Sequence, residues 1–202
     1  MVIPIAILLS GRGSNFLALH AAIARGEIPA RIVLVLSNVA DAPGLARARE
    51  LGLPAVAIPH QGVPGGRQAH EEKVIAALRE SGAEWVCLAG YMRLLSPGFV
   101  DEWRNRILNI HPSLLPAFPG VDAQKQALDY GVKVSGCTVH FVDENLDAGP
   151  IVVQRAVPLL DGDTADSLAA RILEQEHGAY VEALVKLGRG DWRVEGRRVV
   201  FG

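Results

Sequence analysis

The chain has 202 residues, of which 50% are hydrophobic and 21% are charged. This composition fits one soluble globular domain over residues 1–202 with a sizeable core. The formal net charge is −2 and no stretch concentrates Lys and Arg, so nucleic acid and membrane surfaces are not expected partners. The two cysteines lie in apolar runs and suit a reducing cytoplasm. The apolar opening at residues 2–9 follows no basic segment and is too short to span a bilayer, so it predicts a buried first strand and not a signal peptide.

The first half of the chain alternates short apolar runs with longer amphipathic ones. Continuous apolar runs are typical of strands covered on both faces of a parallel sheet. They predict strands at residues 3–10, 31–37, 54–58 and 85–89. Helices are predicted at residues 14–25, 43–51 and 68–81, each followed by a glycine that acts as a stop signal. This alternation predicts an α/β fold with a doubly wound, mostly parallel sheet of the Rossmann-like kind.

The second half predicts a different, mixed β part. A further strand is expected at residues 106–111 and a short helix at residues 123–130, followed by β-rich segments at residues 134–142 and 151–158. A long amphipathic helix is predicted at residues 164–187, with Asp163 as its candidate N-cap. A terminal hairpin is expected at residues 192–201 around a Glu195-Gly196 turn. No Ser-rich linker or internal repeat indicates a domain boundary.

A glycine loop, Ser10-Gly11-Arg12-Gly13-Ser14-Asn15, joins the first predicted strand to the first predicted helix. The backbone N–H groups at a helix start have no intrahelical partner and lie at the positive end of the helix dipole, which favours a phosphate. Ser14 and Asn15 can add side-chain donors. A purely structural turn, with Ser14 as the helix cap, explains the same residues equally well.

Other phosphate-binding loops fit this segment less well. A Walker loop needs a terminal Gly-Lys-Ser/Thr, which is missing. A dinucleotide fingerprint needs a third small residue where this chain has Phe16, and an acidic residue after the second strand where it has Ser37-Asn38. NAD is therefore not expected, and a single phosphomonoester fits better.

The stretch Asn109-Ile110-His111-Pro112 carries the strongest chemical signal. Residues two apart on a strand face the same way, so Asn109 and His111 are expected side by side near the strand's C-terminal end. Ligands bind at that edge of open α/β sheets. An amide beside an imidazole can hold an oxyanion and move a proton. The structural alternative is a hydrogen-bonded loop histidine.

Asp147, in a loop between β-rich segments, is the candidate partner of His111. A carboxylate near an imidazole favours the imidazolium and fixes its orientation, whereas a solvated loop aspartate is the structural alternative. The remaining histidines are scattered, and no zincin motif or cysteine pair indicates a metal site. His140 is expected to be a packed or edge-of-site strand residue. Ser113 lies in no nucleophile elbow, so a serine hydrolase is not expected.

Taken together, these residues resemble the folate-dependent glycinamide ribonucleotide transformylases, also called phosphoribosylglycinamide formyltransferases. The resemblance runs from the first strand to the long C-terminal helix. It is carried by Gly11-Arg12-Gly13-Ser14-Asn15, AGYMRLLSP at residues 89–97, NIHPSLLP at residues 109–116, GCTVHFV at residues 136–142 and LDAGP at residues 146–150.

The resemblance implies transfer of a formyl group from 10-formyltetrahydrofolate, as cosubstrate, to the amine of glycinamide ribonucleotide in purine biosynthesis. It implies no metal. Asn109, His111 and Asp147 would be the catalytic group, and Gly13, Ser14, Asn15 and Glu176 would hold the phosphate and ribose of the ribonucleotide. Arg67, Met92, Arg93, Leu94 and Leu95 would contact the folate, together with the loop before Asp147. Gln124 stands where relatives usually carry a histidine near the substrate. A homodimer is compatible with the sequence.

Three other functions were compared with this one. Formyltetrahydrofolate deformylase shares the Asn, His and Asp constellation but usually has an N-terminal regulatory domain and a different sequence after the catalytic His. Methionyl-tRNA formyltransferase adds a tRNA-binding domain and a basic surface. A nonenzymatic nucleotide-binding module would keep the glycine loop without needing Asn109, His111 and Asp147 together. The transformylase is therefore the expected function, with the deformylase as the alternative.

Overall fold

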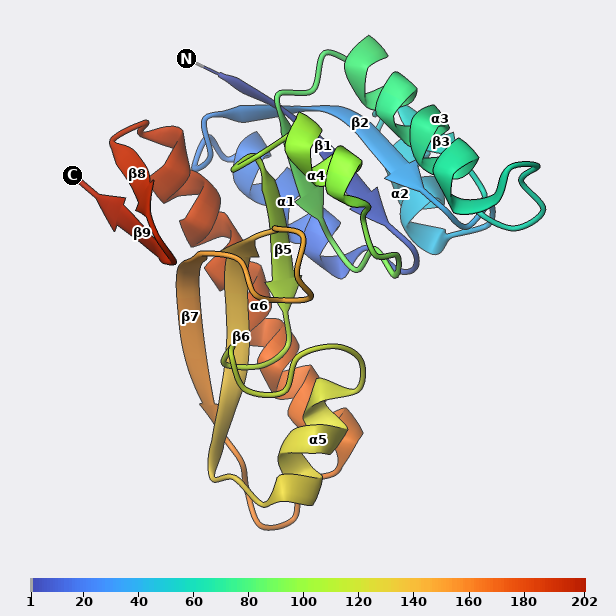
Figure 1. Ribbon diagram of the computed structural model, residues 1–202. Helices are drawn as coiled ribbons and strands as arrows, with labels where there is room; N and C mark the ends of the chain where they lie inside the picture. Colours follow the sequence, from blue (N-terminus) through green and yellow to red (C-terminus); the bar gives the residue numbers. More distant parts are fainter. Residues whose placement is uncertain (1) are drawn as a thin grey trace. The chain divides into compact units, whose positions relative to one another are not determined.

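The computed structural model describes residues 2–202, which form two compact units, Met1–Leu108 (unit 1) and Asn109–Gly202 (unit 2) (Figure 1). The single formyltransferase domain expected over residues 1–202 stays a prediction. Among the described residues, no helix combines the length and apolar character that a membrane crossing needs.

Unit 1 is built on a parallel sheet with the strand order β3-β2-β1-β4. The strands are β1 (Ile3–Leu9), β2 (Ala30–Ser37), β3 (Ala55–Ala57) and β4 (Trp85–Leu88). The order runs outward from β1 to β3 and then reverses to β4 on the other side of β1. This reversal confirms the doubly wound arrangement. Residues 5–9 of β1 are fully buried, as expected for a central strand covered on both faces.

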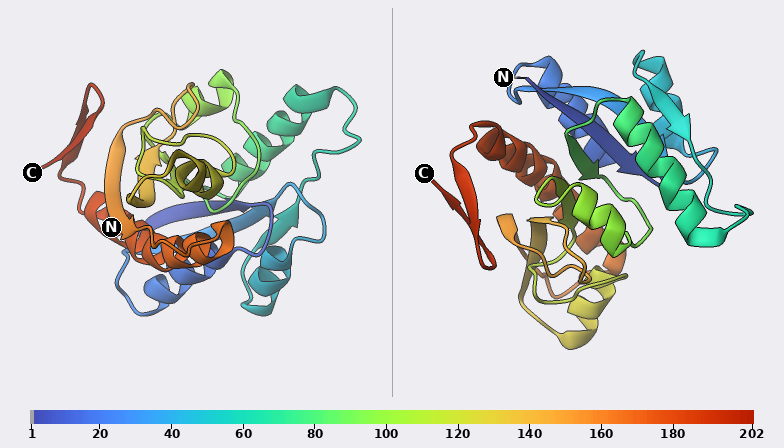
Figure 2. Two further views of the ribbon diagram at one scale, coloured as in Figure 1. Left: turned by 90° about the horizontal axis from the view of Figure 1, so that it is seen from below. Right: turned by 45° about the horizontal axis from the view of Figure 1, so that its top comes forward.

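The helices of unit 1 cover both faces of its sheet. They are α1 (Ser14–Ala24), α2 (Pro43–Glu50), α3 (Gly66–Glu80) and α4 (Pro97–Glu102). The left view of Figure 2 shows α1 and α2 on one face and α3 on the other. Helix α4 was not predicted from the sequence, because its six residues are too few to show a helical period. Its start signal was nevertheless present, since the Ser96 hydroxyl accepts the Phe99 N–H and Pro97 occupies the first helical position.

Strand β5 (Ile107–His111) carries the chain from unit 1 into unit 2. In unit 2, β6 (Val134–Phe141) pairs antiparallel with β7 (Ile151–Pro158), and β7 is followed by the hairpin β9 (Arg198–Phe201) and β8 (Trp192–Glu195). Strand β9 pairs parallel with β7. The helices are α5 (Ala123–Tyr130) and α6 (Ala165–Gly188), and α6 packs on β6 and β7. The expected mixed C-terminal β part and long helix are thus confirmed.

The cap of α6 differs from the expectation. Thr164, and not Asp163, is the N-cap, and its hydroxyl accepts the Ser167 N–H while the Ser167 hydroxyl accepts the Thr164 N–H. Asp163 is displaced from the cap because its carboxylate pairs with both terminal nitrogens of Arg171, each at 2.8 Å. Arg171 also donates to the Pro158 carbonyl at the end of β7. The pair therefore ties the start of α6 to the strand before it.

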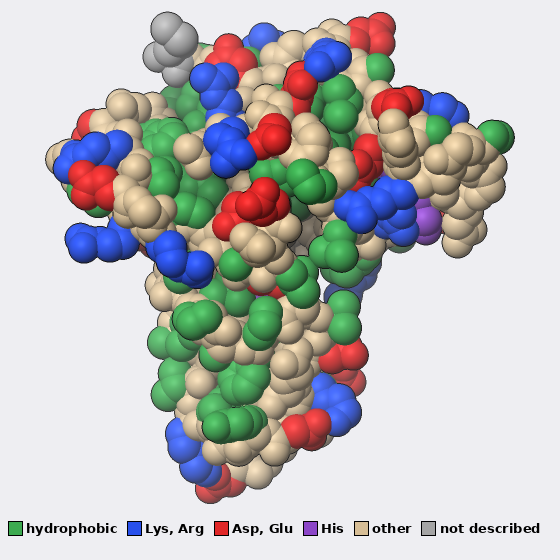
Figure 3. Space-filling view, viewed as in Figure 1, with side chains coloured by type: hydrophobic (Ala, Val, Ile, Leu, Met, Phe, Trp, Pro, Cys, Tyr) green, Lys and Arg blue, Asp and Glu red, His purple; other side chains and the backbone are tan. Residues whose placement is uncertain are grey.

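Charged side chains of both signs are interspersed on the face shown in Figure 3. Exposed ion pairs of the chain include Arg79 with Glu102 and Arg25 with Glu27. Exposed pairs of this kind contribute little to stability.

The Asp163–Arg171 pair predicts how stability depends on pH. The Arg171 guanidinium, helped by the Leu160 N–H, holds the pKa of Asp163 well below its ordinary value. A carboxyl whose pKa is depressed by folding stabilises the protein above its unfolded-state pKa of about 3.9, and that contribution is lost as the pH falls toward the folded-state pKa. Asp163→Asn should lower Tm by a few degrees at neutral pH, and the difference from wild type should shrink below about pH 4. Thermal melts of both proteins across this range test it, and a difference independent of pH would contradict it.

Candidate active site

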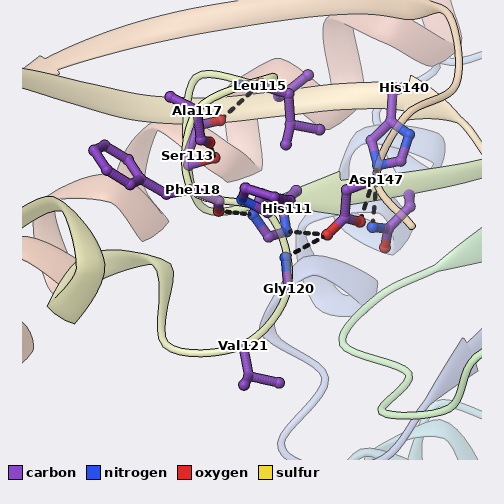
Figure 4. A network of polar contacts seen from close by, with 12 residues as sticks. His111, Ser113, Leu115, Ala117, Phe118, Gly120, Val121, His140 and Asp147 are labelled. Atoms are coloured by element: carbon purple, nitrogen blue, oxygen red, sulfur yellow. Dashed lines mark hydrogen bonds and ion pairs between the residues drawn. The ribbon is translucent and has the colours of Figure 1, made fainter. Parts of the chain in front are cut away.

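The residues expected to act together at the end of β5 do meet within unit 2. Asn109 and His111 lie on β5, and the loop after β6 brings Asp147 to them. The Nδ1 atom of His111 is 3.4 Å from Oδ2 of Asp147, and only 6% and 9% of the two side chains are exposed (Figure 4). Asp147 is therefore a covered partner of His111, and the solvated loop aspartate of the structural alternative is excluded.

The His111 ring lies between two oxygen atoms, one near each of its nitrogens. Its Nε2 atom lies 2.9 Å from the carbonyl oxygen of Phe118, while Nδ1 faces the Asp147 carboxylate. Carbonyl and carboxylate oxygens can only accept hydrogen bonds. Each ring nitrogen therefore has an oxygen acceptor near it, an arrangement that can accommodate an imidazolium.

Asp147 is held in place from the backbone as well as by His111. Its Oδ2 atom accepts the Gly120 N–H at 2.8 Å, and its own φ of 49° is in the left-handed region, where Asp is tolerated better than most residues. The loop returns closely against β6, because a Cβ atom at Gly149 would lie 1.9 Å from the Phe141 carbonyl oxygen. A glycine is therefore required two residues after Asp147.

His140 on β6 completes the cluster. Its Nδ1 atom donates to the Phe141 carbonyl at 2.9 Å, which leaves Nε2 to accept from the Asn109 amide at 3.3 Å. Burial lowers the pKa of His140, although the Phe141 carbonyl and the Asp147 carboxylate act in the opposite direction. His140 is therefore neutral and orients the Asn109 amide. The sequence analysis placed it near the site without this role. The available signal was a polar side chain within a buried strand.

The loop after His111 is fastened to β6 and β7 by two residues that the sequence analysis did not single out. The Thr138 hydroxyl donates to the Ser113 carbonyl at 2.7 Å and accepts the Leu115 N–H at 3.0 Å. Gln154 donates to the Leu115 carbonyl at 2.9 Å. This part of the loop is therefore set by strands that follow it in the chain.

The glycine loop forms the end of β1 and the start of α1 in unit 1. Gly13, with φ of 73°, is the N-cap of α1, and no side chain caps the helix. Ser14 is the first helical residue, so the structural reading of Ser14 as the cap is wrong. A Cβ atom at Gly13 would come within 3.3 Å of the Gly44 Cα atom. The loop therefore packs closely on the start of α2.

The residues expected to contact a folate also come together in unit 1. Arg67 on α3 donates to the Leu94 carbonyl at 2.9 Å and pairs with Glu71 at 3.2 Å. Met92 and Leu94 are 71% and 62% exposed. Arg93 and Leu95 are half-buried beside them.

Two further predicted positions lie on helices of unit 2. Glu176 is on α6 and is 8% exposed, and Gln124 is half-buried on α5. No group of three or more His, Cys, Asp or Glu residues within residues 2–202 is arranged to hold a metal ion.

Comparisons with known proteins place this arrangement in a family. The sequence profile described as formyl transferase matches residues 3–184. The phosphoribosylglycinamide formyltransferase of Escherichia coli is 42% identical over 176 residues, which are 87% of this chain and 82% of that protein. The trifunctional purine biosynthetic protein adenosine-3 of Drosophila pseudoobscura is 50% identical over 94% of this chain, but the chain spans only 14% of that protein's length.

Solved structures give the same result. Glycinamide ribonucleotide transformylase 1 from Symbiobacterium toebii is similar with a TM-score of 0.96 and 48% identity, covering 99% of this chain and 94% of that one. A formyltetrahydrofolate deformylase from Pseudomonas syringae has a TM-score of 0.91 but 26% identity, and only 66% of it is covered. Because the family profile spans nearly the whole chain and the E. coli relative is matched over most of its length, the chain belongs to the formyl transferase family.

Proposed function

We propose that this protein transfers the formyl group of 10-formyltetrahydrofolate to the amine of glycinamide ribonucleotide, giving formylglycinamide ribonucleotide and tetrahydrofolate in de novo purine biosynthesis. The observation that carries the proposal is the cluster of Asn109, His111 and Asp147, in which the imidazole lies between two oxygen acceptors. Family membership and the names of the E. coli and S. toebii relatives support the same reaction.

The cosubstrate supplies an electrophilic formyl carbon carried on N10 of the folate. The amine nitrogen of the ribonucleotide forms a bond to this carbon, the bond from the carbon to N10 breaks, and one proton passes from the amine to N10. Negative charge develops on the formyl oxygen before the second bond breaks. The protein therefore needs a positive charge and a hydrogen-bond donor near that oxygen, and a base near the amine.

Asn109 and His111 supply the hydrogen-bond donor and the positive charge near the formyl oxygen. One N–H of the Asn109 amide donates to His140, which leaves the second N–H for the formyl oxygen. The His111 ring directs its two protons toward Phe118 and Asp147, so its contribution is chiefly the positive charge of the imidazolium. A charge held in a largely water-excluded site stabilises an oxyanion more strongly than the same charge in water.

Asp147 supplies the base near the amine, because its carboxylate can accept a proton from the amine through a water molecule. The same carboxylate also keeps His111 charged. Binding two substrates together contributes further, since juxtaposition can lower a barrier by roughly 7–11 kcal/mol. In this proposal Gly13, Ser14 and Asn15 bind the phosphate and Glu176 binds the ribose hydroxyls. Arg67, Met92, Arg93, Leu94 and Leu95 contact the folate.

The proposal also places the reaction in the cytoplasm, where the buried thiols of Cys87 and Cys137 suit a reducing environment. Small molecules are the expected partners. A homodimer stays a prediction, which light scattering at the assay concentration tests.

The identity of the formyl acceptor separates the proposed transferase from the deformylase. Purified protein should consume 10-formyltetrahydrofolate only when glycinamide ribonucleotide is supplied, because the amine and not water is the nucleophile. Tetrahydrofolate formation, followed spectrophotometrically with and without the ribonucleotide, checks this. Equal consumption in buffer alone would identify the deformylase.

Replacing Asn109 tests the oxyanion donor. Asn109→Asp keeps the size of the side chain but puts a negative charge where the amide donates. Turnover should fall by at least about 10²-fold, as for the loss of an oxyanion-hole donor. The half-buried position should tolerate the change, so the melting temperature is measured alongside turnover. A folded variant with near-normal turnover would remove Asn109 from the catalytic group.

Replacing Asp147 tests its coupling to His111. Asp147→Asn keeps the shape, tolerates the left-handed backbone and can still accept the Gly120 N–H, but it removes the charge. The environment of the His111 ring should change because its charged neighbour is lost, and turnover should fall by at least about 10²-fold. Ring ¹⁵N chemical shifts and turnover are the two measurements.

The matched control for this variant is Asp161→Asn, which removes a 96% exposed carboxylate from the same unit. It should change neither the His111 resonances nor turnover. Unchanged His111 resonances in Asp147→Asn would show that the two residues are not coupled, and unchanged turnover would exclude Asp147 from the mechanism.

A further inference from the structure

The loop that holds Asp147 and His111 has an unusual backbone. Phe118, Gly120 and Asp122 all have positive φ, at 54°, 81° and 57°. Left-handed backbone costs free energy for any residue with a Cβ atom, so two of these three positions are strained. Such a conformation persists only where surrounding contacts impose it. The contacts that impose it here can be identified.

Gln126 on α5 supplies two of these contacts. Its Nε2 atom donates to the Pro119 carbonyl at 3.1 Å and to the Val121 carbonyl at 2.9 Å. Both partners are acceptors, so the amide nitrogen, and not the amide oxygen, must face the loop. One side chain therefore donates hydrogen bonds to the backbone carbonyls of the residues on either side of Gly120.

The backbone groups just before each of these two carbonyls are directed at the catalytic cluster. The Gly120 N–H donates to Oδ2 of Asp147 at 2.8 Å, and the Phe118 carbonyl accepts from Nε2 of His111 at 2.9 Å. Figure 4 shows Phe118 and Gly120 beside His111 and Asp147, with the Val121 side chain directed away from them. The loop thus presents alternate backbone groups to Gln126 and to the cluster.

We propose that Gln126 is a positioning residue for formyl transfer: its carboxamide locks residues 119–121 so that the loop holds the Asp147 carboxylate and the His111 ring in their reactive geometry. This inference rests on the proposed function, because it assumes that Asp147 and His111 carry out the chemistry. Gln126 touches neither of them and acts only through the loop. A misplacement of about 1 Å can reduce turnover by as much as 10²-fold.

The test replaces Gln126 by Met, which has a similar length and no donor. Lys125→Met is the matched control, because Lys125 is the adjacent residue of α5 and its side chain is 67% exposed. Gln126→Met should lower kcat by about 10-fold and leave the KM of both substrates within about two-fold. The control should change neither quantity. Gln126→Glu, which keeps the shape and also lacks the donor, is the second variant if the first does not fold.

A double-mutant cycle separates positioning from a general loss of stability. If Gln126 acts through Asp147, then Gln126→Met should lower the residual kcat of Asp147→Asn by less than about two-fold, because the two effects are not additive. An equal loss of kcat in both backgrounds would overturn the proposal.

A readout that does not depend on activity is the amide proton of Gly120. In Gln126→Met its resonance should move upfield and its exchange with solvent should accelerate, as its hydrogen bond to Asp147 loosens, while Lys125→Met leaves both unchanged. An unchanged Gly120 amide would overturn the proposal even if kcat fell. Absence of formyl transfer by the wild type would refute the proposed function, whereas the amide measurement would still report on the loop.

Discussion

The His111 ring lies between a backbone carbonyl, 2.9 Å from Nε2, and the Asp147 carboxylate, 3.4 Å from Nδ1. Most other features of unit 2 described above contribute to this arrangement. Strand β5 ends at His111, the following loop turns back to present the Phe118 carbonyl, and the loop after β6 presents Asp147. The placement of the ring between two oxygen acceptors is thus a consequence of where three chain segments meet.

The two imidazoles of the cluster illustrate how nearby groups of one kind acquire different roles. His111 has oxygen acceptors at both nitrogens, whereas His140 donates from Nδ1 and accepts an amide N–H at Nε2. Burial lowers the pKa of His140 and keeps it neutral. Different environments around two titratable groups of one cluster are a general way to give them different roles.

In unit 1, the glycine loop likewise depends on backbone segments that approach each other closely. Gly13 adopts a positive φ, and a Cβ atom there would lie 3.3 Å from the Gly44 Cα atom, while a Cβ atom at Gly44 would lie 3.0 Å from the Gly11 carbonyl oxygen, so the loop and the start of α2 are closely packed. This leaves the start of α1 capped by backbone alone. An anion that accepts from helix-terminal N–H groups is the ligand that such a start favours.

The sequence by itself determined the order and type of nearly every element, because apolar runs and glycine stop signals are local properties of the chain. It also identified Asn109, His111 and Asp147 as candidates, since their types and the motifs around them are readable without a structure. It missed α4, which is too short to show a period, and it assigned the cap of α6 to Asp163 because the partner of that carboxylate, Arg171, lies eight residues further on.

Only the tertiary structure decided which atoms of these candidates meet. The protonation of His111 depends on Phe118, the orientation of Asn109 depends on His140, and the placement of Asp147 depends on Gly120 and on Gln126 behind it. The residues in these contacts are separated along the chain by intervals that follow no helix or strand period. Several of the contacts use backbone atoms, which every residue possesses. Backbone donors and acceptors leave no trace in residue type, so their directions become known only when the chain is folded.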